Sequence, residues 1–227
     1  MTSAERRLYE LEVHDGFPRS AAIPGTLTWS QNDSSCDVAV LRLVSDDGVN
    51  RLTSARVAAL TAAVEELAAR PPARLVITGN AHFFSAGADL NQIAALTGPQ
   101  ALDFARMGQR LMNAVADFPA PTIAAVHGYC MGGGFDLALA CSRRIAGPHA
   151  VFGHRGAALG LVTGWGGTQR LPRLIGKARA LQMFLTAEKV GAQRALEIGL
   201  ADAIADDPLA VALKDVGTPG SRPFFGR

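Results

Sequence analysis

The sequence predicts an α/β protein with a largely parallel sheet in its core. Two apolar runs without polar alternation, residues 74–79 and 121–126, are typical of strands buried on both faces. Each run is followed by a glycine-bearing loop and then by a segment in which apolar residues recur at helical spacing. This alternation of strand, loop and helix favours parallel pairing, and parallel sheets bind ligands at the carboxyl ends of their strands.

We expect one core domain with a short extension at each end. A chain of 227 residues is long enough to bury a sizeable core. Residues 1–25 mix charges with Pro18 and Pro24 and predict an irregular N-terminal arm. Residues 26–205 form the expected core domain, and residues 206–227 form a short C-terminal tail.

The first part of the core predicts a hairpin and then a helix. Residues 26–29 and 38–44 have strand character, and the polar turn at 32–35 joins them. Thr53 is placed to cap a helix that ends before Pro71. The apolar residues of this helix recur at helical spacing: Val57, Leu60, Val64 and Leu67.

The second part of the core predicts further helices and two short strands. A helix outlined by Leu102, Ala105, Leu111, Met112 and Val115 ends before Pro119. Strands are expected at residues 143–146 and 150–153. Further helices are expected after the glycine-rich passage 164–172, at residues 178–185 and at residues 192–198.

Composition excludes several classes of protein. The formal charge of +2 and the pI near 8.6, without any block of Lys and Arg, argue against a nucleic-acid partner and leave a small or acidic organic ligand open. Cys36, Cys130 and Cys141 form no CxxC pair, so we expect reduced core thiols. The sequence shows neither an apolar signal region nor a run that spans a bilayer, which predicts a cytoplasmic protein without membrane contact.

Several common site motifs do not fit the sequence. Residues 128–134 do not supply GxGxxG, and residues 83–87 lack the first glycine of a nucleophile elbow. The five histidines share no metal-ligand spacing: His14, His82, His127, His149 and His154. No metal and no separate cofactor are therefore expected.

Four passages, taken in order, carry a more specific signal. They are Phe84-Ser85-Ala86-Gly87-Ala88-Asp89-Leu90, Pro121-Thr122-Ile123-Ala124-Ala125-Val126-His127-Gly128, Gly132-Gly133-Gly134-Phe135-Asp136-Leu137-Ala138 and Gly166-Gly167-Thr168-Gln169-Arg170-Leu171. Together they resemble the enoyl-CoA hydratase/isomerase family, also called the crotonase family, and the resemblance covers residues 26–204. It implies a spiral of ββα units, here with a shortened C-terminal helical region, a place in fatty acid metabolism, and a homo-trimer or hexamer. It also implies that coenzyme A enters as part of an acyl-CoA substrate.

The resemblance assigns roles to individual positions. The backbone amides of Ala88 and Gly133 would form an oxyanion hole for the thioester carbonyl. Fixed N–H donors of this kind stabilise a developing oxyanion by roughly 3–4 kcal/mol each. By the same resemblance Ser85, Ala86, Gly87 and Asp89 would shape the substrate-binding edge, although Asp89 equally predicts a cap for the helix beginning near Leu90. His154 and Trp165 are further substrate-binding candidates, His154 for contact with CoA and Trp165 for the acyl pocket.

The sequence departs from the family at the catalytic carboxylates. Hydratases of the family use two glutamates, whereas the first position here is Asp136 and the second is Gly156. Asp136 therefore remains as the candidate acid/base, which favours isomerase-like chemistry with one carboxylate over water addition. The loop that often carries a CoA-contacting basic residue holds Asp46 and Asp47, with Arg51 nearby.

Two alternatives remain open at this stage. Beside the isomerase-like enzyme, the chain could be a non-catalytic acyl-CoA-binding member of the family, or a thioester hydrolase or C–C lyase on the same scaffold. In the second case His154 would activate the attacking water. A large apolar residue such as Trp165 equally predicts plain core packing.

Overall fold

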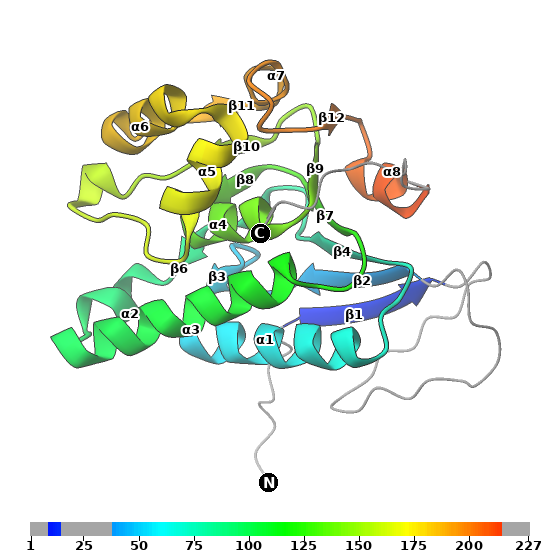
Figure 1. The fold of residues 1–227 in the computed structure, drawn as a ribbon, viewed down its shortest axis with the longest axis horizontal. Helices are drawn as coiled ribbons and strands as arrows, with labels where there is room; N and C mark the ends of the chain where they lie inside the picture. The colour runs from blue at the N-terminus through cyan, green and yellow to red at the C-terminus, as the bar shows by residue number, and fades with distance from the viewer. Residues whose placement is uncertain (1–8, 15–37, 215–227) are drawn as a thin grey trace, which may run out of the picture.

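Two sheets and their covering helices make up the computed structural model, which describes residues 9–14 and 38–214 (Figure 1). The larger sheet has the strand order β1-β2-β4-β7-β9-β12. Its strands are β1 Tyr9–His14, β2 Val38–Leu43, β4 Arg74–Thr78, β7 Thr122–Val126, β9 Arg143–Ala146 and β12 Ala203–Ile204. All neighbours in this sheet are parallel except β1 and β2, as the buried apolar runs predict.

A smaller sheet lies beside the first and has the order β11-β10-β8-β5. Its strands are β11 Val190–Gly191, β10 Val151–Gly153, β8 Tyr129–Met131 and β5 Phe83–Ser85, and a separate parallel pair joins β3 Arg51–Leu52 to β6 Gly87–Ala88. Three consecutive units place their first strand (β4, β7, β9) in the larger sheet and their second (β5, β8, β10) in the smaller one. This repeated step from sheet to sheet is the predicted spiral of ββα units.

The helices cover the sheets and follow the predicted positions closely. They are α1 Ser54–Ala69, α2 Leu90–Ala94, α3 Gly98–Ala116, α4 Gly133–Ala140, α5 Gly167–Ile175, α6 Lys177–Thr186, α7 Ala192–Glu197 and α8 Pro208–Lys214, with a 3₁₀ turn at Ala157–Leu159. In α1 the predicted cap is confirmed, because the Thr53 hydroxyl accepts from Arg56 N at 3.3 Å. The apolar stripe of α1 is fully buried, and α3 packs alongside it. In the described part of the chain, no helix is both long enough and apolar enough to cross a membrane.

Both ends of the described chain differ from the sequence prediction. Residues 9–14, expected in an irregular arm, form β1 and pair antiparallel with β2 in the register Leu11↔Leu41. The physical reason is a short alternation of Tyr9, Leu11 and Val13 with polar residues, which matches a strand at the edge of a sheet. The predicted strand at residues 26–29 lies outside the described residues.

The expected C-terminal tail also begins with ordered structure. Helix α8 follows β12, and its Ala212 is fully buried against the face of the larger sheet that is opposite α1 and α3. This second apolar cluster includes Val38, Val76 and Ile123. The packed core therefore extends past residue 205 to Lys214.

Candidate active site

Two glycine-bearing loops bring the predicted oxyanion residues together. Gly87 has φ +90° and Gly132 has φ +51°, so both adopt backbone conformations that glycine favours. A Cβ at Gly87 would lie 2.6 Å from Met131 O and 2.8 Å from Gly133 N. The two backbones therefore approach closely because neither carries a side chain at this point.

The backbones of Ala88 and Gly133 lie next to each other. A Cβ at Gly133 would lie 3.4 Å from Ala88 N, which places the two residues side by side. Gly133 is the first residue of α4, whose first helical hydrogen bond runs from Asp136 N to Gly132 O at 3.0 Å. The Gly133 amide thus lies at the positive end of the helix dipole.

The expected substrate-binding edge uses its polar side chains for internal hydrogen bonds. The buried Ser85 hydroxyl donates to Asn50 O at 2.7 Å and accepts from Gly87 N at 3.1 Å. The Asp89 carboxylate caps α2 by accepting from Asn91 N at 2.9 Å, as the alternative prediction has it. Ser85 and Asp89, together with the backbone of Ala86 and Gly87, therefore shape the loop that carries Ala88, while contact with coenzyme A stays a prediction.

Asp136 lies in the first turn of α4 and is buried, with 2% of its surface exposed. Its Oδ2 accepts a hydrogen bond from the Thr163 hydroxyl, and its Oδ1 lies 3.0 Å from His154 Nε2. The carboxylate therefore contacts two side chains from segments outside α4, Thr163 and His154, in addition to its place in the first turn of α4. The sequence offered no pattern that singles out Thr163.

His154 follows β10 and is also buried, with 5% of its surface exposed. Its imidazole contacts two phenyl rings in tilted arrangements, with ring centroids 5.2 Å from Phe135 and 5.5 Å from Phe184. His154 thus faces Asp136 inside the protein, and its contact with a substrate stays a prediction.

Gly156, which the resemblance places at the second glutamate, has no room for a side chain in this loop. Its carbonyl accepts from Leu159 N and Leu161 N, both at 2.8 Å, and a Cβ would lie 2.6 Å from Leu161 O. The local backbone is therefore folded around a glycine. A second carboxylate at this position is incompatible with the loop conformation.

Trp165 fills the space beside Gly133. A Cβ at Gly133 would lie 2.3 Å from Trp165 Cζ3, and a Cβ at Gly108 would lie 2.1 Å from Trp165 Nε1. The indole is 4% exposed, donates to Phe104 O at 3.3 Å and packs on the Phe104 ring. Two glycines on α3 and α4 thus form a slot for Trp165, which borders the candidate oxyanion amide, while its role in an acyl pocket stays a prediction.

Two buried neighbours of Asp136, Arg170 and Cys130, have shifted pKa values. Burial lowers the pKa of the Arg170 guanidinium, while the charges of Asp136 and Asp117 raise that pKa. Burial also raises the pKa of the Cys130 thiol well above its usual range, which leaves this neighbour of Asp136 protonated. Among the described residues, no three His, Cys, Asp or Glu side chains are grouped so as to hold a metal ion.

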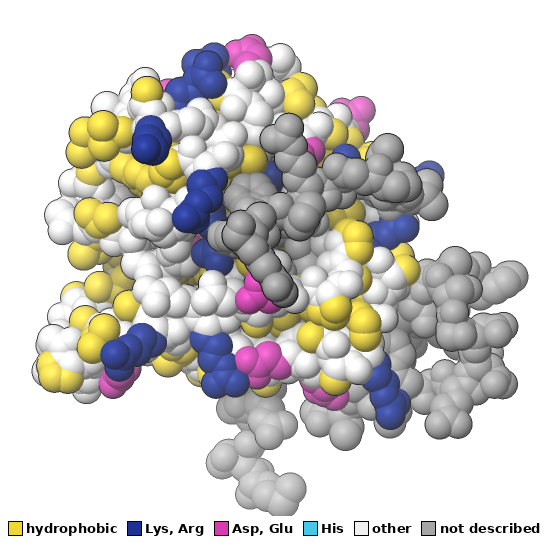
Figure 2. All heavy atoms as spheres, viewed as in Figure 1, with side chains coloured by type: hydrophobic (Ala, Val, Ile, Leu, Met, Phe, Trp, Pro, Cys, Tyr) yellow, Lys and Arg dark blue, Asp and Glu magenta, His cyan; other side chains and the backbone are white. Residues whose placement is uncertain are grey.

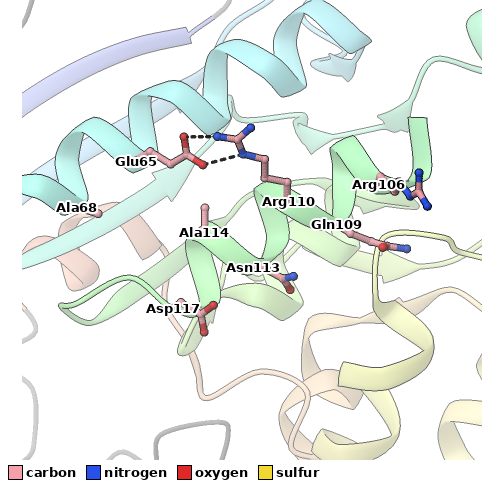
Figure 3. Close-up of a pocket in the computed structure, with 8 residues that line it drawn as sticks. All are labelled: Glu65, Ala68, Arg106, Gln109, Arg110, Asn113, Ala114 and Asp117. Atoms are coloured by element: carbon pink, nitrogen blue, oxygen red, sulfur yellow. Dashed lines mark hydrogen bonds and ion pairs between the residues drawn. The ribbon is translucent and has the colours of Figure 1, made fainter. Parts of the chain in front are cut away.

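A depression of about 570 Å³ lies on the outer face of α1 and α3, away from these residues (Figure 3). Arg110 forms a two-bond ion pair with Glu65 there, with both distances 2.9 Å, and both side chains are exposed. Exposed pairs contribute little free energy, and the depression contains none of the predicted site residues. We therefore place the candidate active site at Ala88, Gly133 and Asp136.

The spiral of ββα units and the meeting of two glycine-bearing loops define a crotonase-fold protein. Structures of the same fold include Pseudomonas aeruginosa DspI, with 37% identity over 78% of this chain and 75% of that chain and a TM-score of 0.74. Enoyl-CoA hydratase from Bacillus anthracis matches with 33% identity over 81% and 71% of the two chains and a TM-score of 0.73. Enoyl-CoA hydratase from Thermoplasma volcanium matches with 31% identity over 79% and 72% and a TM-score of 0.75.

The sequence model of the enoyl-CoA hydratase/isomerase family matches residues 33–213. The chain belongs to the enoyl-CoA hydratase/isomerase family. The family prediction made from the four sequence passages is thereby confirmed.

Proposed function

We propose that the protein is an enzyme that acts on acyl-CoA thioesters, with Ala88 and Gly133 donating to the thioester oxygen and Asp136 moving a proton. The observation that carries the proposal is the placement of a buried carboxylate, Asp136, in the helix turn that also presents the Gly133 amide beside Ala88. A C–H bond next to a thioester carbonyl becomes acidic when fixed donors stabilise the enolate oxygen. A carboxylate near that carbon then supplies the base.

The reaction that fits best is the shift of a double bond in an enoyl-CoA. Asp136 takes the proton from the α carbon, and the electron pair passes into the enolate, whose oxygen accepts hydrogen bonds from the two amides. Protonation at the γ carbon then gives the conjugated 2-enoyl-CoA, so the overall atom count is unchanged. Water addition is disfavoured because Gly156 supplies no second carboxylate.

The test uses 3-enoyl-CoA esters of several chain lengths, with product detection by mass spectrometry and ultraviolet absorbance. We expect Asp136→Asn to lower turnover at least 100-fold while acyl-CoA affinity, measured by calorimetry, stays within a few-fold of the native value. Asp103→Asn, at an exposed position on α3, is the matched control and should leave both unchanged. Full turnover by Asp136→Asn would remove Asp136 from the mechanism.

The non-catalytic alternative rests on one specific observation. Trp165 packs against Gly133, so the space next to the candidate oxyanion amide is filled by the indole. A binding protein would bind acyl-CoA esters and convert none of the 3-enoyl, 2-enoyl, 3-hydroxyacyl or β-ketoacyl forms. Hydrolysis or C–C cleavage, the remaining alternative, would release free CoA or a shortened thioester in the same assay.

We also propose that the protein assembles into a homo-trimer or hexamer, as the family resemblance implies. The proposal is supported by hydrophobic side chains that gather on the side of the molecule where α6 lies (Figure 2). On α6, Leu181 is 57% exposed and Leu185 is 69% exposed. Light scattering after size-exclusion chromatography should give a mass three or six times that of the chain, and a monomer would contradict the proposal.

A further inference from the structure

The contact between Asp136 and His154 is unusual for two buried polar groups. Their facing atoms, Oδ1 and Nε2, are 3.0 Å apart, yet within the described part of the chain neither atom has an aligned hydrogen-bond partner. Buried polar atoms are almost always hydrogen-bonded, so an exception calls for an explanation. In unliganded enzymes, catalytic hydrogen bonds are often misaligned and tighten when substrate is bound.

The two groups are held in place from several directions. The Thr163 hydroxyl donates a hydrogen bond to Asp136 Oδ2, which fixes the carboxylate, and the rings of Phe135 and Phe184 pack against the imidazole. The geometry of the pair is therefore imposed by its surroundings. Such fixed placement is what a proton-transfer site requires.

Gly167, the first residue of α5, borders both facing atoms. A Cβ at Gly167 would lie 2.2 Å from Asp136 Oδ1 and 2.9 Å from His154 Nε2. The backbone of Gly167 is therefore packed against both atoms, and any side chain at position 167 would displace them. Arg170 on the same helix acts electrostatically on Asp136, and Arg155 follows His154 as an exposed residue.

The spacing of the pair matches a particular reaction geometry. The α and γ carbons of an enoyl chain are separated by two bonds, or about 2.5 Å. Two proton-transfer atoms 3.0 Å apart are thus able to serve these two carbons, one atom for each. A single carboxylate would have to carry the same proton from one carbon to the other.

We propose that His154 is a second catalytic residue, which protonates the γ carbon while Asp136 takes the proton from the α carbon. The inference rests on the proposed function. The cycle starts with the Asp136 carboxylate and the His154 imidazolium. The α C–H bond breaks as Asp136 takes the proton, its electron pair forms the α–β double bond through the enolate, and the former β–γ electron pair takes the proton of His154. Proton transfer from Asp136 to His154 across the contact then restores the starting ion pair.

The first experiment needs no variant. Native protein in excess converts an α-deuterated 3-enoyl-CoA in ordinary water in a single turnover, and mass spectrometry locates the label in the product. With two groups, the proton at the γ carbon comes from His154, so the product carries no deuterium there. Deuterium transferred from the α to the γ carbon would overturn the inference and leave the proposed function standing.

The second experiment separates the two residues by comparing exchange with isomerisation. In D₂O, His154→Gln should still exchange the α proton of the thioester at a rate within a few-fold of native, but should lose isomerisation at least 100-fold. Asp136→Asn should lose both. A parallel loss of exchange, isomerisation and thermal stability in His154→Gln would show a structural role and overturn the inference.

Thr163→Val tests the positioning of Asp136 in the same assays. We expect slower exchange together with slower isomerisation and unchanged acyl-CoA affinity, because Thr163 acts through Asp136.

Isomerisation at the native rate in His154→Gln would overturn the inference and leave the proposed function standing. Native protein that neither exchanges nor isomerises any ester of the panel would overturn both the inference and the proposed function.

Discussion

Gly108→Ala is a substitution for which helix propensity and packing predict opposite signs. Gly108 lies in the interior of α3, where replacing glycine by alanine ordinarily stabilises a helix by about 1 kcal/mol. A Cβ at this position, however, would lie 2.1 Å from Trp165 Nε1. The indole cannot retreat, because its opposite edge packs against Gly133. Overpacking costs about 1–3 kcal/mol, and a 2.1 Å approach to a fixed ring places this substitution in the upper part of that range, at about 2–3 kcal/mol. After the gain of about 1 kcal/mol in helix propensity, we expect a net loss of about 1–2 kcal/mol.

The assay is urea unfolding followed by circular dichroism, with the slope of the transition used to check that the unfolded state is unchanged. Gly98→Ala, at the first position of the same helix, is the matched control. No heavy atom lies within 4 Å of its added Cβ, and we expect stability between the native value and about 1 kcal/mol above it.

A double-mutant cycle shows whether the clash is with Trp165. Trp165→Ala alone should cost about 3–5 kcal/mol, because a buried indole is removed. In that background Gly108→Ala should become stabilising by about 1 kcal/mol, which reverses its sign. Native or higher stability of Gly108→Ala with Trp165 present would refute the slot formed by the two glycines.

Three further predictions follow from the packing and capping of the fold. In a Cys36→Ser variant, Cys130 and Cys141 should resist thiol reagents at pH 8 until the protein is unfolded. The reason is that burial raises the pKa of the Cys130 thiol and raises the pKa of the Cys141 thiol to about 12. Rapid labelling of the folded protein would contradict this. Thr53→Ala should lower the free energy of unfolding by about 1 kcal/mol through loss of the α1 cap, whereas Thr53→Ser should retain it, as urea unfolding will show. Asp202→Ala should lower the free energy of unfolding by about 2 kcal/mol or more in the same assay. The substitution leaves the buried Arg144 without the carboxylate that lies 3.0 Å from its Nη2. An unchanged unfolding midpoint would argue against this ion pair.

Local patterns were sufficient to predict most of the fold. The stripe of α1 and its Thr53 cap are encoded within a few residues of each other, and the runs that form β4 and β7 are apolar without interruption because both faces are covered. Strand β1 was missed because its short alternation includes charged residues, and its stability depends on pairing with β2. Helix α8 was missed because it is only a short apolar segment, Pro208–Lys214, and its stability depends on packing against the sheet face that it covers.

Some parts of the candidate site could also be predicted from the sequence, and others could not. Glycines at positions 87, 132 and 133 mark close backbone approach, so the two loops predicted a site at this edge of the sheet. The pairing of Ala88 with Gly133 within these loops came from the family resemblance. The contacts of Asp136 were not predictable, since Thr163 is 27 residues away in sequence and belongs to a loop without a recognisable motif. His154 was a candidate by residue type, but its contact with Asp136 depends on how β10 and α4 pack.

The glycine at position 156 leads to a final prediction, that restoring the family glutamate there will not restore hydration. A Cβ at this position would lie 2.6 Å from Leu161 O, and the Gly156 carbonyl already closes the turn by accepting from Leu159 N and Leu161 N. Gly156→Glu must therefore shift the segment that also contains Thr163 and Trp165, and so disturb Asp136. We expect lower isomerisation, lower stability by about 1–3 kcal/mol, and no hydration of a 2-enoyl-CoA. Ala158→Glu, at an exposed position of the same loop, controls for the added charge. A gain of hydration by Gly156→Glu would mean that the loop adapts and that one residue separates this protein from two-carboxylate chemistry.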